Sequence, residues 1–156
     1  MEKHEDFKKG ISHNKFGCAC LGANMLEKAE DHLLKAETFV NKYVQFSNVY
    51  MNLGNLYAQR RLYKKAAELY ERVIEMSPFT KEQQCNEEFA EVRYSPKINS
   101  YGAYVDAHTN LAVMCVNTDE YQKGFEFCKK SIELSPDNPE SQINFGDILR
   151  QVGRKD

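Results

Sequence analysis

Apolar and polar residues along 47–78 recur with the period of an α-helix. The first apolar stripe consists of Tyr50, Leu53, Gly54 and Tyr57, and the second, after a polar break at 59–61, of Tyr63, Ala66, Tyr70 and Val73. Pro78 ends the second stripe, because proline lacks the N–H that would continue a helix. The segment therefore predicts two short amphipathic helices joined by a tight link. Such a pair cannot bury both apolar faces alone and needs copies of itself on either side.

This segment resembles a tetratricopeptide repeat, a family with a period of about 34 residues and the pattern Trp-x2-Leu-Gly-x2-Tyr, then Ala-x3-Phe, then Pro. The matching residues are Tyr50, Leu53, Gly54, Tyr57, Ala66, Tyr70 and Pro78. We expect Gly54 and Ala66 to be small because the paired helices touch there, with the three tyrosines filling the space around them. Ser47 takes the first position, where it is a suitable helix N-cap.

The same register extends over most of the chain. A weaker copy at about 10–43 carries Phe16, Gly17, Cys20, Ala29, Leu33 and Ala36, and a third copy lies at 105–138 after the second at 47–80. Half of a fourth repeat covers 139–156, with Asn138 as its N-cap and Gly153 as its C-cap. The sequence therefore predicts one all-α domain over 1–156, a solenoid of antiparallel helix pairs.

An insert of 24 residues, 81–104, separates the second and third repeats. We expect a short helix as far as about Val92, then a loop that contains Pro96 and Gly102. The half repeat at the C-terminal side has two interpretations: a capping helix, or the place where a longer solenoid is cut. The link-like residues 151–156 favour the second.

Charge and composition narrow the classes of partner. The chain has 21 basic and 23 acidic residues and no basic tract, so we expect neither nucleic acid nor a membrane surface as a partner. No apolar run has the length of a membrane-spanning helix, and the charged start lacks the apolar core of a secretory signal. Five cysteines, an odd number, favour a reduced, cytoplasmic protein.

Candidate chemistry is sparse. Cys18 and Cys20 with His13 suggest a metal site, but the two thiols are expected on different faces of a helix, and packing is the simpler interpretation. His108 is expected in the core and His32 in solvent. We find no nucleophile–base pair, phosphate loop or carboxylate dyad, and therefore expect no enzyme and no cofactor.

The resemblance implies a peptide-binding surface instead. In this family the first helix of each repeat lines the concave face. One inward-facing position holds Asn52, Asn110 and Asn144 in three of the copies and Lys15 in the first. A carboxamide both donates and accepts, so such a row can bond the main chain of an extended peptide. The row is similar to the asparagine ladders of O-linked N-acetylglucosamine transferase and the peroxisomal matrix-protein receptor. Asn48, Asn55 and Asn117 widen it; the simpler interpretation is that these amides only face water.

Two functions of different class follow. In the first, the chain is a scaffold that binds an extended segment of a protein partner in its concave groove. In the second, it is a structural segment of a larger repeat protein or assembly that self-associates through its terminal helices. The co-chaperone clamps of the family grip acidic tails with basic residues, but the corresponding positions here hold residues such as Asp106 and Glu140. A heat-shock chaperone tail is therefore not the expected ligand.

Overall fold

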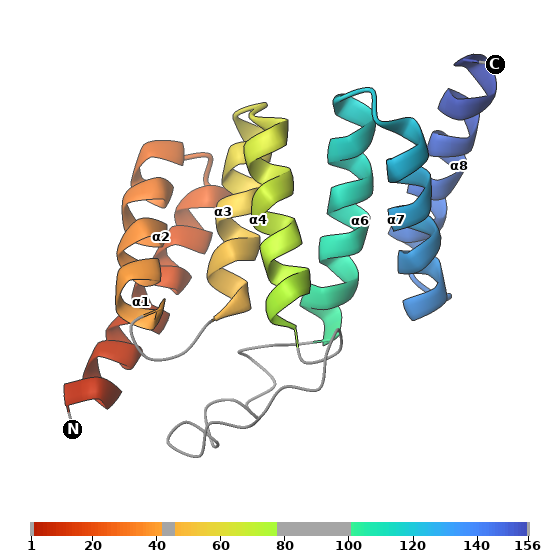
Figure 1. Cartoon of the computed structure of the whole chain (residues 1–156). Coiled ribbons are helices and arrows are strands. Elements are labelled where there is room, and N and C mark those ends of the chain that lie inside the picture. The colour runs from red at the N-terminus through yellow and green to blue at the C-terminus, as the bar shows by residue number, and fades with distance from the viewer. Residues whose placement is uncertain (1, 42–45, 78–100, 156) are drawn as a thin grey trace.

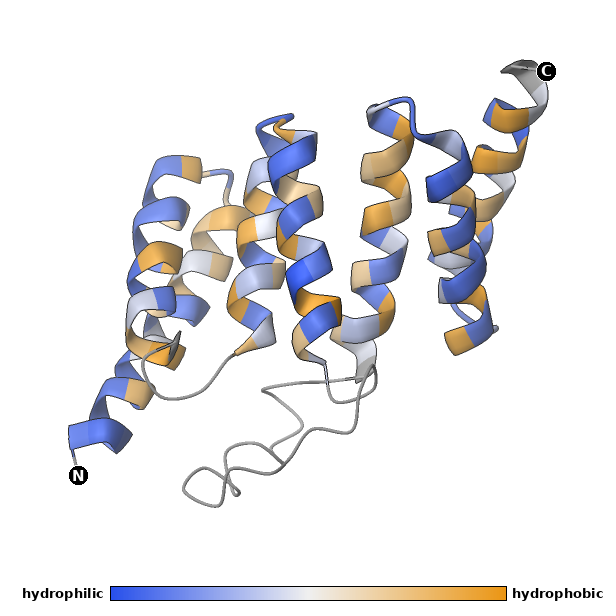
Figure 2. Ribbon diagram, in the orientation of Figure 1, coloured by the Kyte–Doolittle hydropathy of each residue, from blue (hydrophilic) through white to orange (hydrophobic). Residues whose placement is uncertain are grey.

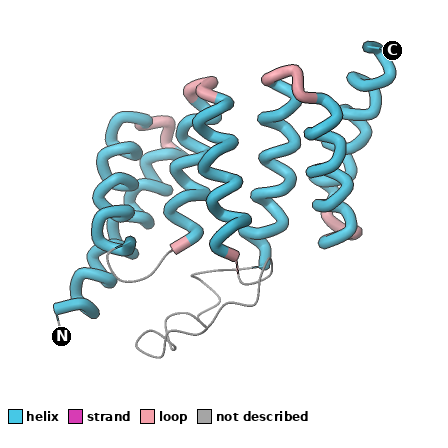
Figure 3. Tube along the Cα trace, viewed as in Figure 1, coloured by secondary structure: helices cyan, strands magenta, loops and turns pink. Residues whose placement is uncertain are grey.

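The computed structural model describes residues 2–41, 46–77 and 101–155, and the regular structure within these ranges is helical throughout (Figure 3). The helices are α1 (Glu2–Gly22), α2 (Leu26–Asn41), α3 (Ser47–Gln59), α4 (Tyr63–Met76), α6 (Tyr101–Asn117), α7 (Tyr121–Leu134) and α8 (Pro139–Lys155). Residues 78–100, which include most of the predicted insert at 81–104, lie outside the described residues, as do 42–45.

Consecutive helices form antiparallel pairs that stand side by side in chain order (Figure 1). The pairs are α1 with α2, α3 with α4, and α6 with α7, followed by α8 alone. Contacts between pairs run from α1 and α2 to α3, from α3 and α4 to α6, and from α6 and α7 to α8. The first helices of successive pairs are therefore neighbours. This arrangement confirms the predicted all-α solenoid.

The turn inside each helix pair has the same backbone in all three copies. Its left-handed residue is Asn24, Arg61 or Asp119, with φ of 59°, 61° and 61°. In each copy, the amide of the residue directly before the second helix donates at 2.8 Å to the carbonyl five residues earlier in the sequence: Met25 to Cys20, Leu62 to Tyr57, and Glu120 to Cys115. These bonds close the first helix as a left-handed C-terminal cap does. The three acceptors occupy the same position of the predicted pattern, so the three helix pairs share one turn at the same place in the repeat.

Small residues set the distance between paired helices. A Cβ atom added to Gly54 would lie 2.6 Å from Cε1 of Tyr70 in α4, and one added to Gly17 would lie 2.6 Å from Cγ of Leu33 in α2. Both distances are shorter than van der Waals contact, so the partner side chain occupies the space that a larger residue needs. Gly146 of α8, at the same pattern position, has no atom within 4 Å of such a Cβ.

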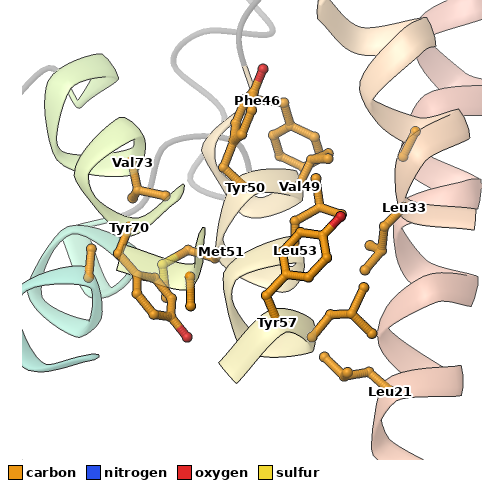
Figure 4. Packing of buried hydrophobic residues seen from close by; sticks show 14 of the residues in the cluster. Leu21, Leu33, Phe46, Val49, Tyr50, Met51, Leu53, Tyr57, Tyr70 and Val73 are labelled. Carbon is orange, nitrogen blue, oxygen red and sulfur yellow. The ribbon is translucent and has the colours of Figure 1, made fainter. Parts of the chain in front are cut away.

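The main core lies between the first two pairs and continues to α6. Figure 4 shows Leu53 and Tyr57 of α3 on the side facing Leu33, with Tyr70 and Val73 of α4 across the helix from them. Figure 2 shows that α6 is apolar along much of its length whereas α4 presents a largely hydrophilic face to the viewer. The reason is that α6 contacts α3, α4, α7 and α8 and has little surface left for water.

A buried cluster of three hydroxyl groups joins α8 to the third pair. The Thr109 Oγ1 lies 2.5 Å from Oγ of Ser131 and 3.1 Å from Oγ of Ser141, and the two serine oxygens are 2.7 Å apart. All three side chains are almost completely buried, and Thr109 also donates to the Val105 carbonyl. Because each hydroxyl both donates and accepts, the triangle satisfies its own polar groups at the junction of α6, α7 and α8.

Several predicted helix ends differ from the observed ones. Asn138 caps α8 as predicted, since its Oδ1 accepts from the amides of Glu140 and Ser141 at 3.0 and 3.4 Å. Ser47 is not an N-cap: it is the first residue of α3 and is buried. Gly153 is not a C-cap, because α8 continues to Lys155 and no described glycine has positive φ. Helix α6 begins at Tyr101, so 101–104, assigned to the insert by spacing, form its first turn.

A matched pair of alanine substitutions tests the role of the close helix contact. Gly54→Ala should lower the free energy of unfolding by about 1–3 kcal/mol, because the new methyl group overlaps the Tyr70 ring. Gly146→Ala should raise it by about 0.5–1 kcal/mol, since alanine favours the helix and meets open space. Urea unfolding followed by circular dichroism measures both. Equal effects of the two substitutions would contradict the packing register.

Candidate functional site

A groove of about 520 Å³ crosses the first helices of the successive pairs. Its walls come from the C-terminal half of α1, from α3 and α6, and from the N-terminal half of α8, and the one contribution from a second helix is Tyr70 of α4. The lining residues are Cys18, Leu21, Gly22, Asn52, Asn55, Ala58, Gln59, Tyr70, Asn110, Val113, Met114, Glu140 and Asn144. The groove arises because the first helices lie next to one another while the second helices pack behind them.

Four of the six predicted peptide-binding residues meet in this groove. They are Asn52 and Asn55 of α3, Asn110 of α6 and Asn144 of α8. The other two do not line it. Asn117 is exposed near the end of α6, where its Nδ2 donates to the Val113 carbonyl at 2.9 Å, and Asn48 is half-buried in the first turn of α3.

The first amide contact joins α3 to α1. The Nδ2 of Asn52 donates to Oδ1 of Asn14 at 2.9 Å. Asn14 is only 7% exposed, so this bond satisfies a polar group that has little access to water. Asn52 therefore has a structural role between the first two pairs as well as a place in the groove. Sequence reasoning did not assign Asn14 to the site. Asn14 directly precedes Lys15, the residue that the first copy has at the position of Asn52, Asn110 and Asn144.

The second amide contact joins α3 to α6 and includes a tyrosine from the core. The Tyr70 hydroxyl donates to Oδ1 of Asn55 at 2.7 Å, and Nδ2 of Asn110 approaches the same oxygen at 3.5 Å. The longer contact is weak by distance. Burial raises the pKa of Tyr70, so the hydroxyl keeps its proton and acts as a donor. Tyr70 was predicted only as a packing residue, because the pattern does not show that its ring reaches the groove.

Bonding capacity remains along the row. An amide offers two N–H donors and an oxygen with two lone pairs, so Asn52 and Asn110 each use a fraction of it. No hydrogen bond to the Asn144 side chain occurs among the described residues, although this side chain lines the groove. Asn144 also lines a smaller adjoining pocket of about 270 Å³ between α6 and α8, together with Val113 and the ion-paired Asp147 and Arg150. The amides that line the groove can donate hydrogen bonds to an uncharged polar chain and accept hydrogen bonds from it.

The histidines and cysteines considered as metal ligands lie apart from this groove, with one exception. Cys18 is exposed and lines the groove, whereas Cys20 packs against the core, so their thiols lie on different faces of α1. His32 is not simply solvated as predicted: its Nδ1 lies 3.1 Å from Nδ1 of His13, and the two rings stack. Within residues 2–41, 46–77 and 101–155, no three His, Cys, Asp or Glu side chains converge as metal ligands would.

His108 is a core residue, as predicted. Its ring is 5% exposed, and its Nδ1–H donates to the Tyr104 carbonyl at 2.9 Å. Cys115 and Cys128 are likewise buried at packing positions, and burial raises the pKa of each thiol to about 11. These thiols are therefore protonated at neutral pH and are poor metal ligands and poor nucleophiles. No helix in the described ranges is long and apolar enough to cross a bilayer.

Comparison with known proteins gives the same repeat unit at two places in the chain. Two family models, both described as tetratricopeptide repeat, match residues 47–79 and 105–138. A search of curated proteins found no sequence match. The matched segments coincide with the second and third predicted repeats.

Solved structures of similar fold extend the agreement over nearly the whole chain. The TPR domain of Arabidopsis OM64 has a TM-score of 0.71 at 10% identity, covering 94% of this chain and 98% of that one. The N-terminal domain of stress-induced protein-1 (STI-1) from C. elegans has a TM-score of 0.66 at 14% identity, covering 92% and 97%. YrrB, described as a TPR protein with an unusual peptide-binding site, has 0.66 at 18%, covering 96% of this chain and 64% of its own.

The two shifted histidines predict a loss of stability in mild acid. Burial, and then the charges of His32 and Lys35, lower the pKa of His13; burial, and then Lys130, lower that of His108 despite its bond to Tyr104. A histidine with a lowered pKa binds fewer protons folded than unfolded. Its contribution to stability is therefore complete above the unfolded value of about 6.5 and is lost as pH falls through the lower folded-state pKa.

The measurement is the free energy of unfolding in urea between pH 7.5 and about pH 5. The wild type should become less stable as the pH falls, and His13→Phe should reduce this dependence, because an aromatic ring can still stack on Phe39 without taking up a proton. His4→Gln, at an exposed position of α1, is the control and should keep the wild-type dependence. A steeper dependence in His13→Phe would contradict the assignment.

Proposed function

The chain belongs to the tetratricopeptide-repeat family and is a protein–protein interaction module, and we propose that this module binds an extended segment of a partner in the amide-lined groove. The proposal rests on one observation above all. Four asparagines from three first helices line a single groove, although they are separated by as many as 92 positions in the sequence, from Asn52 to Asn144.

The chemistry of the groove suits a main chain better than a particular side chain. Each peptide unit of an extended segment presents one N–H and one C=O, and a carboxamide can bond either. Among the described residues, the lining carries one charged residue, Glu140, while the remaining side chains are amides, apolar groups, a thiol and a phenol. Recognition of this kind depends on backbone hydrogen bonds and on a few pockets for side chains.

Peptide selection tests the proposal without knowledge of the natural partner. A display library of random twelve-residue peptides is selected against the full chain, and the affinity of a recovered peptide is measured by calorimetry. Asn110→Ala and Asn144→Ala should each weaken binding by about 1–2 kcal/mol, the scale of a hydrogen bond lost from a group that stays desolvated. Both side chains line the groove and carry at most one weak internal bond, so the fold should be preserved.

Two further variants separate binding from folding. Asn117→Ala removes the same group from the same helix as Asn110 but outside the groove, and should bind the peptide with wild-type affinity. Asn52→Ala leaves the buried Asn14 without its partner and should therefore lower thermal stability as well as affinity. Wild-type affinity in a well-folded Asn110→Ala/Asn144→Ala variant would remove the amide row from the mechanism.

A second candidate function, stacking with another copy of the chain, is favoured by the outer face of α8. Ile143 is 64% exposed and Leu149 46% exposed, and they flank Gly146, where an added Cβ atom would meet no atom within 4 Å. In the first two pairs, the glycine at this pattern position is covered by the second helix. At the opposite end, Phe16 of α1 is 61% exposed, so both ends of the row of helices present apolar side chains.

Sedimentation at several protein concentrations tests this second function. If the ends stack, the wild type should associate as concentration rises, and Leu149→Asp should weaken association by about tenfold or more, as expected for a buried apolar contact. Leu62→Asp is the matched control, because Leu62 is 47% exposed in the turn between α3 and α4, away from both ends. A monomeric wild type at every concentration would exclude stacking.

The cytoplasmic location remains a prediction from the sequence.

A further inference from the structure

The charge in the groove is confined to one end. Glu140 lines the groove at the start of α8, one helical turn before Asn144. Asp106 stands one turn before Asn110 on the neighbouring helix α6, so the two carboxylates occupy equivalent places relative to the amide row. The equivalent residue of α3 is the uncharged Asn48, four positions before Asn52. The carboxylates therefore mark the α6–α8 end.

Asp106 and Glu140 carry like charges on two helices that contact each other. Burial, and after it the charge of Glu140, raise the pKa of the Asp106 carboxyl, which is the effect of a like charge nearby. No lysine or arginine lines the groove, and neither carboxylate forms an ion pair with another side chain in the described part of the chain. Two neighbouring carboxylates without a counter-ion repel each other, and a cation placed between them would relieve this repulsion.

Helix capping explains only one of the pair. Glu140 is in the first turn of α8, where a negative charge interacts favourably with the free amides of the helix N-terminus. Asp106, by contrast, is the sixth residue of α6, beyond the first turn over which that effect acts. Asp106 therefore gains no such stabilisation from the terminus of its own helix.

We propose that the segment bound in the groove carries a lysine or arginine whose side chain lies between Asp106 and Glu140. This inference rests on the proposed function and adds a side-chain preference to main-chain binding. A basic side chain is long enough to reach from a peptide beside Asn110 and Asn144 to the carboxylates one helical turn away. Its positive charge would give both carboxylates a counter-ion. Acidic peptides would be rejected at the same place, since their charge adds to the repulsion.

The display selection described above tests the preference directly. Peptides recovered with the wild-type chain should share a lysine or arginine at one fixed position and should lack aspartate and glutamate next to it. Selection with Asp106→Asn/Glu140→Gln should still recover peptides, but without that shared basic residue. Recovery of wild-type binders with no common basic residue would overturn this inference and leave the proposed function standing. Failure to recover any binder would overturn both.

A double-mutant cycle gives the size of the effect. Replacing the shared basic residue of a selected peptide by glutamine should weaken binding to the wild type by about fivefold, the scale of exposed ion pairs, and should have no effect on Asp106→Asn/Glu140→Gln. Glu126→Gln/Glu133→Gln, which changes the net charge equally at exposed sites of α7, is the control and should retain the fivefold difference. The same fivefold loss in both charge variants would overturn the placement of the basic side chain.

Discussion

The contact between Tyr70 and Gly54 connects the packing of the helices to the chemistry of the groove. Because Gly54 has no side chain, the Tyr70 ring lies directly against α3, and its hydroxyl reaches Oδ1 of Asn55 at 2.7 Å. Asn55 is in turn the acceptor for Asn110 on the next first helix. A larger residue at Gly54 would move the ring and with it the donor that orients Asn55. One close approach in the core therefore fixes part of the groove surface.

The asparagine side chains of the amide row form hydrogen bonds between helices, and the same side chains are those proposed to bind a partner. Neighbouring first helices are connected by two amide contacts, a bond between Asn14 and Asn52 and the longer, weaker contact between Asn55 and Asn110. Each unit of a solenoid contacts only its neighbours, so such contacts contribute to the cohesion of the stack. Asn52, Asn55 and Asn110 also line the groove, and these contacts leave part of their bonding capacity unused. If the groove binds a partner as proposed, a substitution in this row on α1, α3 or α6 would change both the binding and the cohesion of the stack. Asn144, at the end of the row, lines the groove but forms no side-chain hydrogen bond within the described residues, so its substitution removes no hydrogen bond between helices.

The sequence predicts those parts of the structure that depend on local spacing. The apolar stripes, the small residue at Gly54 and the cap at Asn138 follow from contacts or bonds that recur at fixed intervals. The partner of an amide does not follow from spacing, because it depends on which side chain the neighbouring helix brings near. Nor does a helix end: Gly153 fits a C-cap in the sequence, yet α8 continues through it to Lys155.

The two candidate functions use opposite sides of α8. Successive residues of an α-helix are separated by about 100°, so Asn144 and Gly146 point about 200° apart. Asn144 lines the groove beside α6, whereas Gly146 meets open space. Ile148, 3% exposed, lies close to the Asn144 side of the helix and holds it against the third pair. A peptide in the groove and a second copy on the outer face therefore do not compete for the same residues, and a substitution on one face leaves the other available for measurement.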